Sequence, residues 1–139
     1  MTATLFFVSC SQIQKKNETS ETVNKPAEPV KMQQQKPVDK NLLAGDWVRT
    51  DAEYRIQISE LMNDGKMKAG YFNPASINVD KAKWAFESGL LKVFIELKDE
   101  NYPGSNYDLI YIPEKDMLAG KYFQAVEGVT YDVGFVRKK

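Results

Sequence analysis

The chain has 139 residues, with 19 Lys and Arg against 19 Asp and Glu, no His and a single Cys. A formal net charge of zero gives no electrostatic reason to expect a nucleic acid as the partner. Without His, and with one Cys, the sequence excludes His-based catalytic triads, His-ligated metal centres and Cys-rich zinc sites. We therefore expect neither a metal ion nor a cofactor.

The first ten residues, MTATLFFVSC, combine a short apolar run at residues 5–8 with a small residue, Ser9, directly before the only Cys. This order resembles the end of a bacterial lipoprotein signal peptide, in which the Cys is lipidated and becomes the mature N-terminus. The resemblance implies a signal peptide over residues 1–10 and a palmitate-type lipid on Cys10. It also implies a lipid-anchored location in the bacterial cell envelope, at the outer membrane or the cell surface.

A complete signal peptide carries a basic start and roughly 7 to 15 apolar residues. No Lys or Arg precedes Cys10, so we expect that the natural start lies further upstream. The alternative interpretation is a buried, structural Cys in an N-terminal strand.

Residues 11–41 differ in composition from the rest of the chain. They hold six Lys, four acidic residues, three Pro and no aromatic residue. A segment with so little apolar surface cannot offset the conformational entropy that ordering would cost. We predict a disordered tether over residues 11–41 and a folded domain over residues 42–139.

The folded domain is predicted to be all β, because apolar and polar residues alternate with a period of two in one segment after another. Turn signals such as Asp64-Gly65 separate these segments. A change of parity within residues 77–86 predicts a bulge near residues 80–83. The predicted strands are eight, at residues 46–50, 54–58, 66–72, 77–86, 91–97, 107–111, 117–123 and 131–137.

Eight short strands joined by tight turns favour an antiparallel up-and-down β-barrel, because closure removes both exposed sheet edges. The inward positions carry bulky side chains that would fill such a barrel. We therefore expect a shallow site at the mouth rather than a deep pocket. The residues assigned to the interior are Tyr54, Ile56, Ile58, Trp84, Phe86, Leu91, Val93, Ile95, Leu97 and Tyr122.

Two features at the ends of the domain carry a family resemblance. Gly45-Asp46-Trp47 opens the first predicted strand, and Arg137 lies near the end of the last. This arrangement resembles the calycins, which include lipocalins, avidins and small bacterial inhibitor barrels. The resemblance implies that Trp47 plugs one end of the barrel while the Arg137 guanidinium stacks on the indole and bonds nearby carbonyls. It implies a fold and no particular activity.

Three further segments, residues 71–74, 77–79 and 102–107, resemble a family of small uncharacterised bacterial secreted or lipoprotein domains. That resemblance supports the envelope location. It implies no chemistry for the domain.

The segment of residues 102–107 is the predicted recognition loop. It joins two strands and carries Pro, Gly and polar side chains between two tyrosines, and binding residues concentrate on loops held by a rigid scaffold. The alternative role of this segment is a Pro-Gly turn that covers the barrel end. For Asn73 and Asn78, the alternative is that their side chains form hydrogen bonds with the backbone around Pro74. The residues expected to contact a ligand or partner are Tyr102, Ser105, Asn106 and Tyr107, with Asn73 as a neighbour.

These features favour a membrane-tethered binding domain that recognises a small ligand or an envelope protein at the barrel mouth. The alternative is an inhibitor of an envelope or secreted hydrolase, such as a protease or a lysozyme. Catalysis by paired carboxylates would have to use Glu96, Asp99, Glu100 or Asp108. Because alternation places Glu96 and Asp108 on outer faces, we expect no enzymatic activity.

Overall fold

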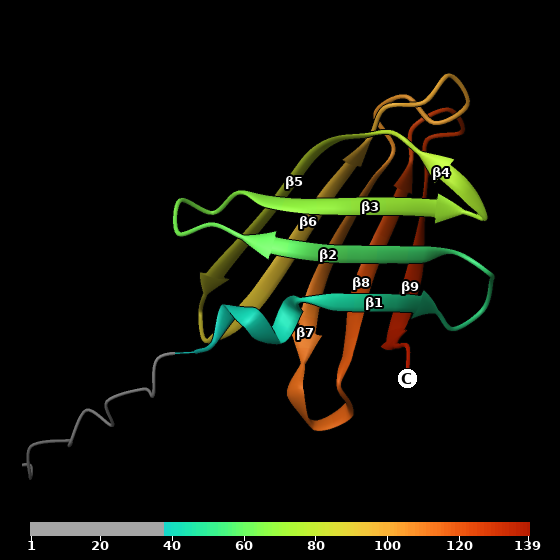
Figure 1. Ribbon diagram of the computed structural model, residues 1–139. Helices are drawn as coiled ribbons and strands as arrows, with labels where there is room; N and C mark the ends of the chain where they lie inside the picture. Colours follow the sequence, from blue (N-terminus) through green and yellow to red (C-terminus); the bar gives the residue numbers. More distant parts are fainter. Residues whose placement is uncertain (1–37) are drawn as a thin grey trace, which may run out of the picture. The chain divides into compact units, whose positions relative to one another are not determined.

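The computed structural model describes residues 38–139 as a nearly closed antiparallel β-barrel (Figure 1). Each strand pairs with antiparallel neighbours in the order β4-β3-β2-β1-β9-β8-β7-β6-β5, which confirms the predicted all-β, up-and-down architecture. Residues 1–10, Cys10 included, and residues 11–37 of the tether lie outside the described residues.

The elements are a 3-10 helix η3 (Lys40–Leu43), strands β1 (Gly45–Arg49), β2 (Arg55–Leu61), β3 (Met67–Asn73), β4 (Ala75–Ile77), β5 (Val79–Glu87), β6 (Leu90–Leu97) and β7 (Asn106–Ile112), a 3-10 turn η4 (Pro113–Lys115), and strands β8 (Met117–Gln124) and β9 (Val129–Arg137).

The sheet has nine strands rather than the predicted eight. The predicted strand at residues 77–86 is divided at Asn78, because the residues on its two sides pair with different neighbours. Ile77 pairs with Tyr71 of β3, whereas Val79 pairs with Leu97 of β6. The predicted bulge is present, since the β5–β6 register shifts between Val79 and Lys81.

The barrel nearly closes where the start of β3, the neighbour of edge strand β4, meets β5 at the other end of the strand order. An isolated bridge joins Lys66 to Lys83, and the Trp84 amide donates a hydrogen bond of 2.9 Å to the Gly65 carbonyl. The Trp84 indole N–H also donates to the Met62 carbonyl at 2.7 Å. These contacts bring the sheet edges together at one end, which limits the unpaired edge that an open sheet would expose.

The interior is filled by side chains that alternate inward along most of the long strands, whereas β5 has no buried residue. In β6, for example, each second residue is buried, as expected for a wall with one apolar and one solvated face. The buried apolar side chains form one contiguous cluster. Its members are Leu43, Trp47, Ile56, Ile58, Met67, Tyr71, Ile77, Leu91, Val93, Ile95, Leu97, Tyr107, Leu109, Tyr111, Leu118, Tyr122, Val133 and Phe135.

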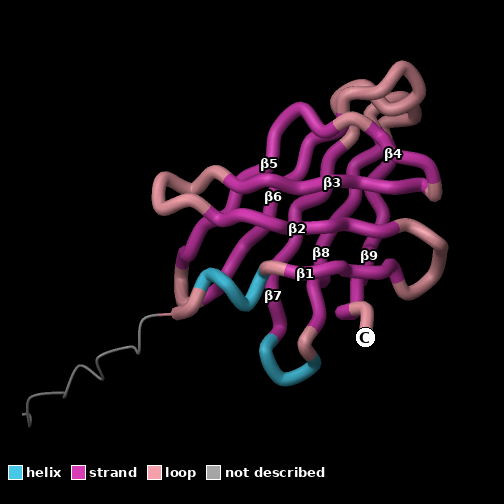
Figure 2. Tube along the Cα trace, viewed as in Figure 1, coloured by secondary structure: helices cyan, strands magenta, loops and turns pink. Residues whose placement is uncertain are grey.

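The up-and-down topology gives the barrel two different ends (Figure 2). One end, here called the base, carries η3, η4 and the β2–β3 and β5–β6 turns. The other end, here called the mouth, carries the β1–β2 loop at residues 50–54, the β6–β7 loop at residues 98–105 and the β8–β9 loop at residues 125–128. The described chain enters the barrel at the base.

Trp47 closes the base. Its ring is fully buried, and its indole N–H donates to the Leu43 carbonyl of η3 at 2.9 Å. The Arg137 guanidinium lies over the indole, with Cζ 4.3 Å from the ring centroid. Gly45 has a φ of +136°, and a Cβ there would lie 2.6 Å from Arg137 Nη1, so glycine at this position allows the arginine to reach the indole.

All three nitrogens of the Arg137 guanidinium have partners. Nε and Nη2 donate to the two Asp116 carboxylate oxygens at 2.8 and 3.1 Å. Nη1 donates to the Ala44 carbonyl at 2.6 Å, and Nη2 donates to the Leu42 carbonyl at 2.7 Å. Arg137 thus ties β9, η4 and the segment before β1 into one structural cap.

Candidate functional site

A pocket of about 370 Å³ opens at the mouth of the barrel. Almost all side chains that line this mouth pocket end in a polar group, which is a hydroxyl, a carboxylate, an amide or a guanidinium. Five are tyrosines, which offer both a flat apolar face and a hydroxyl. The lining residues are Arg49, Asp51, Ala52, Tyr54, Tyr71, Asn73, Tyr102, Tyr122, Gln124 and Tyr131.

The strands position these groups by continuing their inward alternation to the mouth. Trp47 faces the interior from β1, and Arg49, two residues later, faces the same way at the end of the strand. Asn73 follows Tyr71 in β3 in the same manner, and Gln124 follows Tyr122 in β8. The interior therefore changes from apolar to polar over the last inward position of several strands.

Arg49 is the only cation among the residues that line the mouth pocket. Its side chain is 10% exposed, whereas the Asp51 side chain that pairs with it is 59% exposed. Nε and Nη2 donate to the two Asp51 carboxylate oxygens at 2.6 and 3.2 Å, and the hydrogen bonds hold the pKa of Asp51 below its usual value. The guanidinium also lies over the ring of Tyr54 at 5.1 Å.

Tyr107 packs beneath the floor of the mouth pocket, against the lining residues Tyr71 and Tyr122. Its ring is fully buried and stacks on Tyr122 with centroids 4.5 Å apart, and its hydroxyl lies 2.9 Å from the Tyr71 hydroxyl. Burial raises the pKa of Tyr107 to about 12, against the opposing effects of Tyr71 and Arg49. Burial also raises the pKa of Tyr71. Both phenols are therefore neutral hydrogen-bonding groups at physiological pH.

Gln124 presents an unsatisfied acceptor. Its Oε1 atom is buried and has no hydrogen-bond partner within residues 38–139. Leaving a buried polar atom without a partner costs about 1–3 kcal/mol. At the wall of a pocket such an acceptor can take a hydrogen bond from a water molecule or from a ligand.

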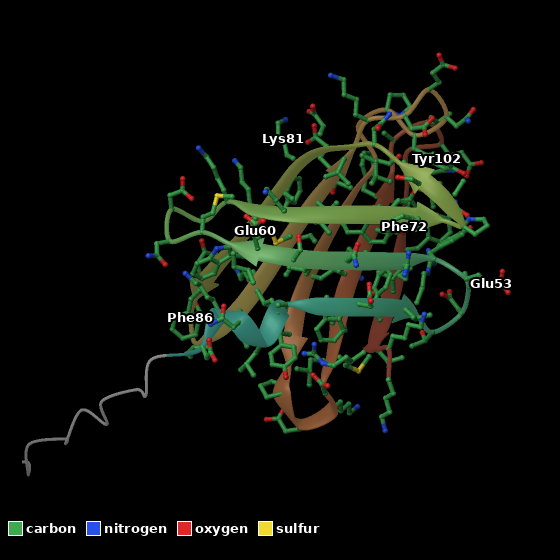
Figure 3. All side chains as sticks on the ribbon, in the orientation of Figure 1. Glu53, Glu60, Phe72, Lys81, Phe86 and Tyr102 are labelled. Atoms are coloured by element: carbon green, nitrogen blue, oxygen red, sulfur yellow. The ribbon has the colours of Figure 1, made fainter. Side chains whose placement is uncertain are left out.

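The structure brings two of the five predicted contact residues to the mouth pocket. Tyr102 and Asn73 line it, and the Asn73 side-chain amide donates to the Tyr102 hydroxyl at 3.4 Å. Figure 3 shows Tyr102 and Glu53 at the mouth and Phe86 far from them, toward the base. The sequence interpretation thus identified part of one wall.

The other three predicted contact residues lie elsewhere. Ser105 is fully buried, and its hydroxyl accepts the Ala125 amide at 3.0 Å, which joins the β6–β7 and β8–β9 loops. Tyr107 lies beneath the floor because it begins the inward alternation of β7. The Asn106 side chain donates to the Gly104 carbonyl at 3.2 Å, within its own loop. These placements explain the three residues as supports of the mouth.

Sequence reasoning missed Arg49, Tyr71, Gln124 and Tyr131. The inward-facing residues recur at every second position of a strand. Continuing this count beyond the last apolar residue, up to the mouth, identifies these four residues. The unsatisfied state of Gln124 depends on atomic positions and has no counterpart in the sequence.

The carboxylates considered for catalysis do not converge. Glu96 bonds Lys81 at 3.0 Å, and Asp108 is exposed. Nowhere in residues 38–139 do three or more Cys, Asp or Glu side chains gather so that they could hold a metal ion. The same residues contain no helix with the length and apolar character needed to cross a membrane.

A larger hollow of about 510 Å³ lies on the outer wall, between the β2–β3 turn and β5–β7. Four of its charged side chains pair with one another, Lys92 with Glu87 at 2.9 Å and Lys66 with Asp64 at 3.5 Å. The mouth pocket is smaller but holds recessed polar groups, so it is the better candidate for a specific site.

Comparisons with protein-family models, curated proteins and solved structures found no match for this chain. The likeness to calycins therefore rests on the nearly closed antiparallel barrel and on the packing of Trp47 and Arg137 at its base.

Proposed function

We propose that this protein is a binding domain of the bacterial cell envelope that takes a small ligand in the mouth pocket. The observation that carries this proposal is the contrast within the barrel. Below Tyr107 the interior is filled by packed apolar side chains, whereas above it the side chains are polar and partly unsatisfied. Convergent polar groups in a concave aromatic site are typical of ligand recognition.

The N-terminal segment supports the location. The apolar run and Ser9 before Cys10 resemble a lipoprotein leader, and residues 11–41 have the composition of a tether. The described domain begins at the base, at the end opposite the mouth pocket. We propose a lipid on Cys10 as the membrane anchor.

One observation favours a protein partner as the second candidate. Several exposed apolar side chains lie on β8, β9 and their connecting loop beside the mouth, and they include Phe123, Val126 and Val129. An exposed apolar rim next to a recessed site suits a surface that contacts another protein. Inhibition of an envelope or secreted hydrolase would use this rim.

Capture from an envelope extract tests the ligand proposal. The full chain is purified from the extract, and bound material is identified by mass spectrometry. We expect a small molecule that is lost in the Gln124→Ala/Tyr131→Ala variant and retained in the Phe94→Ala variant, which changes only the outer wall. Stoichiometric capture of a hydrolase, unaffected by Gln124→Ala/Tyr131→Ala, would support the second candidate instead.

Fatty-acid labelling tests the anchor separately. The chain, expressed with a complete signal peptide, is expected to incorporate labelled fatty acid and to partition into detergent. The Cys10→Ala variant should lose both properties. Equal labelling of this variant would contradict the proposed anchor without affecting the mouth pocket.

A further inference from the structure

The Arg49 guanidinium is only partly engaged by its own chain. Its side-on face, formed by Nε and Nη2, is filled by the Asp51 carboxylate. The guanidinium also interacts with the hydroxyl of Tyr107 beneath the mouth pocket. At Arg137, by contrast, the end-on face donates to two main-chain carbonyls. Because a guanidinium carries five N–H donors, Arg49 retains donor capacity for an oxygen atom of a ligand in the mouth pocket.

The same pocket contains the opposite kind of unfilled group. Gln124 Oε1 is a buried acceptor without a donor. A carboxylate could accept a hydrogen bond from Arg49 but offers no hydrogen to Gln124, and an ammonium group could donate to Gln124 but cannot accept a hydrogen bond from Arg49. A hydroxyl both donates and accepts. Hydroxyl groups therefore match both unfilled positions.

The charges around the mouth disfavour an anionic ligand. The charge of Arg49 is already neutralised by Asp51. The electrostatic potential at the mouth is therefore set mainly by the charged residues of the surrounding loops. Lys98 is the basic residue of the three mouth loops. Against it stand acidic residues on all three loops, at Glu53, Asp99, Glu100 and Glu127. An approaching anion is repelled by this rim, whereas a neutral molecule is not.

The tyrosines supply flat faces beside the polar groups. Tyr131 is 43% exposed, and its ring stacks on Tyr122 with centroids 6.4 Å apart and an angle of 21°. The C–H-bearing face of a sugar ring packs on such a surface while its hydroxyls form hydrogen bonds at the edge. A pocket of about 370 Å³ lies near the lower limit for ligand sites, which suits one or two rings.

We infer that the mouth pocket binds a neutral saccharide of one or two rings. An N–H group of Arg49 donates to a hydroxyl oxygen, Gln124 Oε1 accepts a hydroxyl hydrogen, and Tyr131 packs against the ring. This inference rests on the proposed function and specifies its ligand class.

The test is a titration of the full chain with glucose, galactose, N-acetylglucosamine and their disaccharides, followed by 1H–15N NMR. At least one sugar is expected to shift the Arg49 Nε–H and Gln124 side-chain amide signals saturably. The affinity should stay constant between about 50 and 500 mM NaCl, since neutral ligands are not screened. Arg49→Lys keeps the charge but loses the planar fork, so it should weaken binding about 10-fold or more.

Arg55→Lys is the matched control. Arg55 also pairs with an aspartate, Asp46, and lies over an aromatic ring, Phe72, but it is on the outer wall. This variant should bind the sugar as the unmodified chain does. Equal weakening by Arg55→Lys and Arg49→Lys would overturn the assignment to the mouth.

Acetate and inorganic phosphate are the competing probes. If they shift the mouth signals in a salt-dependent manner and no sugar does, the saccharide inference is wrong while the mouth remains a binding site. If no sugar binds but extract capture yields another small molecule dependent on Gln124 and Tyr131, the inference again fails and the proposed function stands. If capture yields nothing that depends on the mouth, the proposed function itself fails.

Discussion

The two ends of the barrel each hold one arginine beside aromatic rings, and the two guanidinium groups are engaged to different extents. Both use Nε and Nη2 to bind an aspartate, Asp116 at the base and Asp51 at the mouth. At the base the remaining donors reach the carbonyls of Leu42 and Ala44. At the mouth Arg49 interacts further with the hydroxyl of Tyr107 and reaches no main-chain carbonyl within residues 38–139.

This difference separates a structural role from a recognition role for the same residue type. A guanidinium whose donors are all satisfied by its own chain contributes to stability and has nothing left to offer a ligand. One whose donors are half satisfied, in a pocket with an unsatisfied Gln124, can exchange water for ligand at little cost to the fold. Mutations at the base should therefore change stability, and mutations at the mouth should change binding.

Removal of the Trp47 side chain should have the largest effect. Trp47 is fully buried, contacts Arg137 and bonds Leu43 through its indole N–H. Trp47→Ala leaves a large cavity and should lower the free energy of unfolding by ~3–5 kcal/mol, measured by urea denaturation. A loss below about 1 kcal/mol would mean that the base is not closed by this residue.

The two arginines provide the direct comparison. Arg137→Lys abolishes the planar fork that joins Asp116 to the Leu42 and Ala44 carbonyls, so unfolding free energy should fall by about 1–2 kcal/mol. Arg49→Lys loses hydrogen bonds to an exposed aspartate and part of its contacts with Tyr54 and Tyr107, and it should cost less than Arg137→Lys, about 0.5 kcal/mol. Equal losses in thermal denaturation would remove the distinction between the two ends.

The base should also show an acid dependence that involves Asp116. The hydrogen bond from Arg137 is the main cause that lowers the pKa of Asp116 below its ordinary value. Ionised Asp116 therefore stabilises the fold above the unfolded pKa of about 3.9, and this contribution is lost as the pH falls through the folded-state pKa. Asp116→Asn should accordingly reduce stability more at pH 7 than at pH 2.5. A difference that is the same at both pH values would contradict this linkage.

Much of the fold could be predicted from the sequence because a wall with one buried face imposes a period of two. Trp47 and Arg137 could be linked because the resemblance to calycins implies that a basic residue of the last strand packs across the indole of the first, and β1 pairs with β9 in the structure. The division at Asn78 could not be predicted, since it depends on whether Ile77 and Val79 share a pairing partner. In the structure Ile77 pairs with β3 and Val79 pairs with β6, so the two residues have different partners.

The candidate site was predicted less completely, for a reason visible at Tyr107. Its place in the inward alternation of β7 indicates burial, whereas its place at the end of a Pro-Gly loop indicates exposure. The alternation decides, because the strand continues to Asn106 and fixes the direction of the side chain. The same rule applied to β1 and β8 would have identified Arg49 and Gln124.

The smallest effect on stability is expected in the recognition loop itself, where Tyr102 and Asn106 can be separated. Tyr102 lines the mouth pocket and accepts a hydrogen bond from Asn73, whereas the Asn106 side chain bonds only its own loop at Gly104. Each alanine variant should stay within about 1 kcal/mol of the unmodified chain, because loop changes seldom disturb a fold. Tyr102→Ala should weaken ligand capture while Asn106→Ala leaves it unchanged, as measured by titration with the captured molecule.

If Asn106→Ala weakens binding as strongly as Tyr102→Ala, the ligand contacts the outside of the loop and the site lies above the mouth pocket. If Tyr102→Ala instead unfolds the domain, this tyrosine is part of the packing that closes the barrel end, and recognition must be assigned to Arg49, Gln124 and Tyr131 alone.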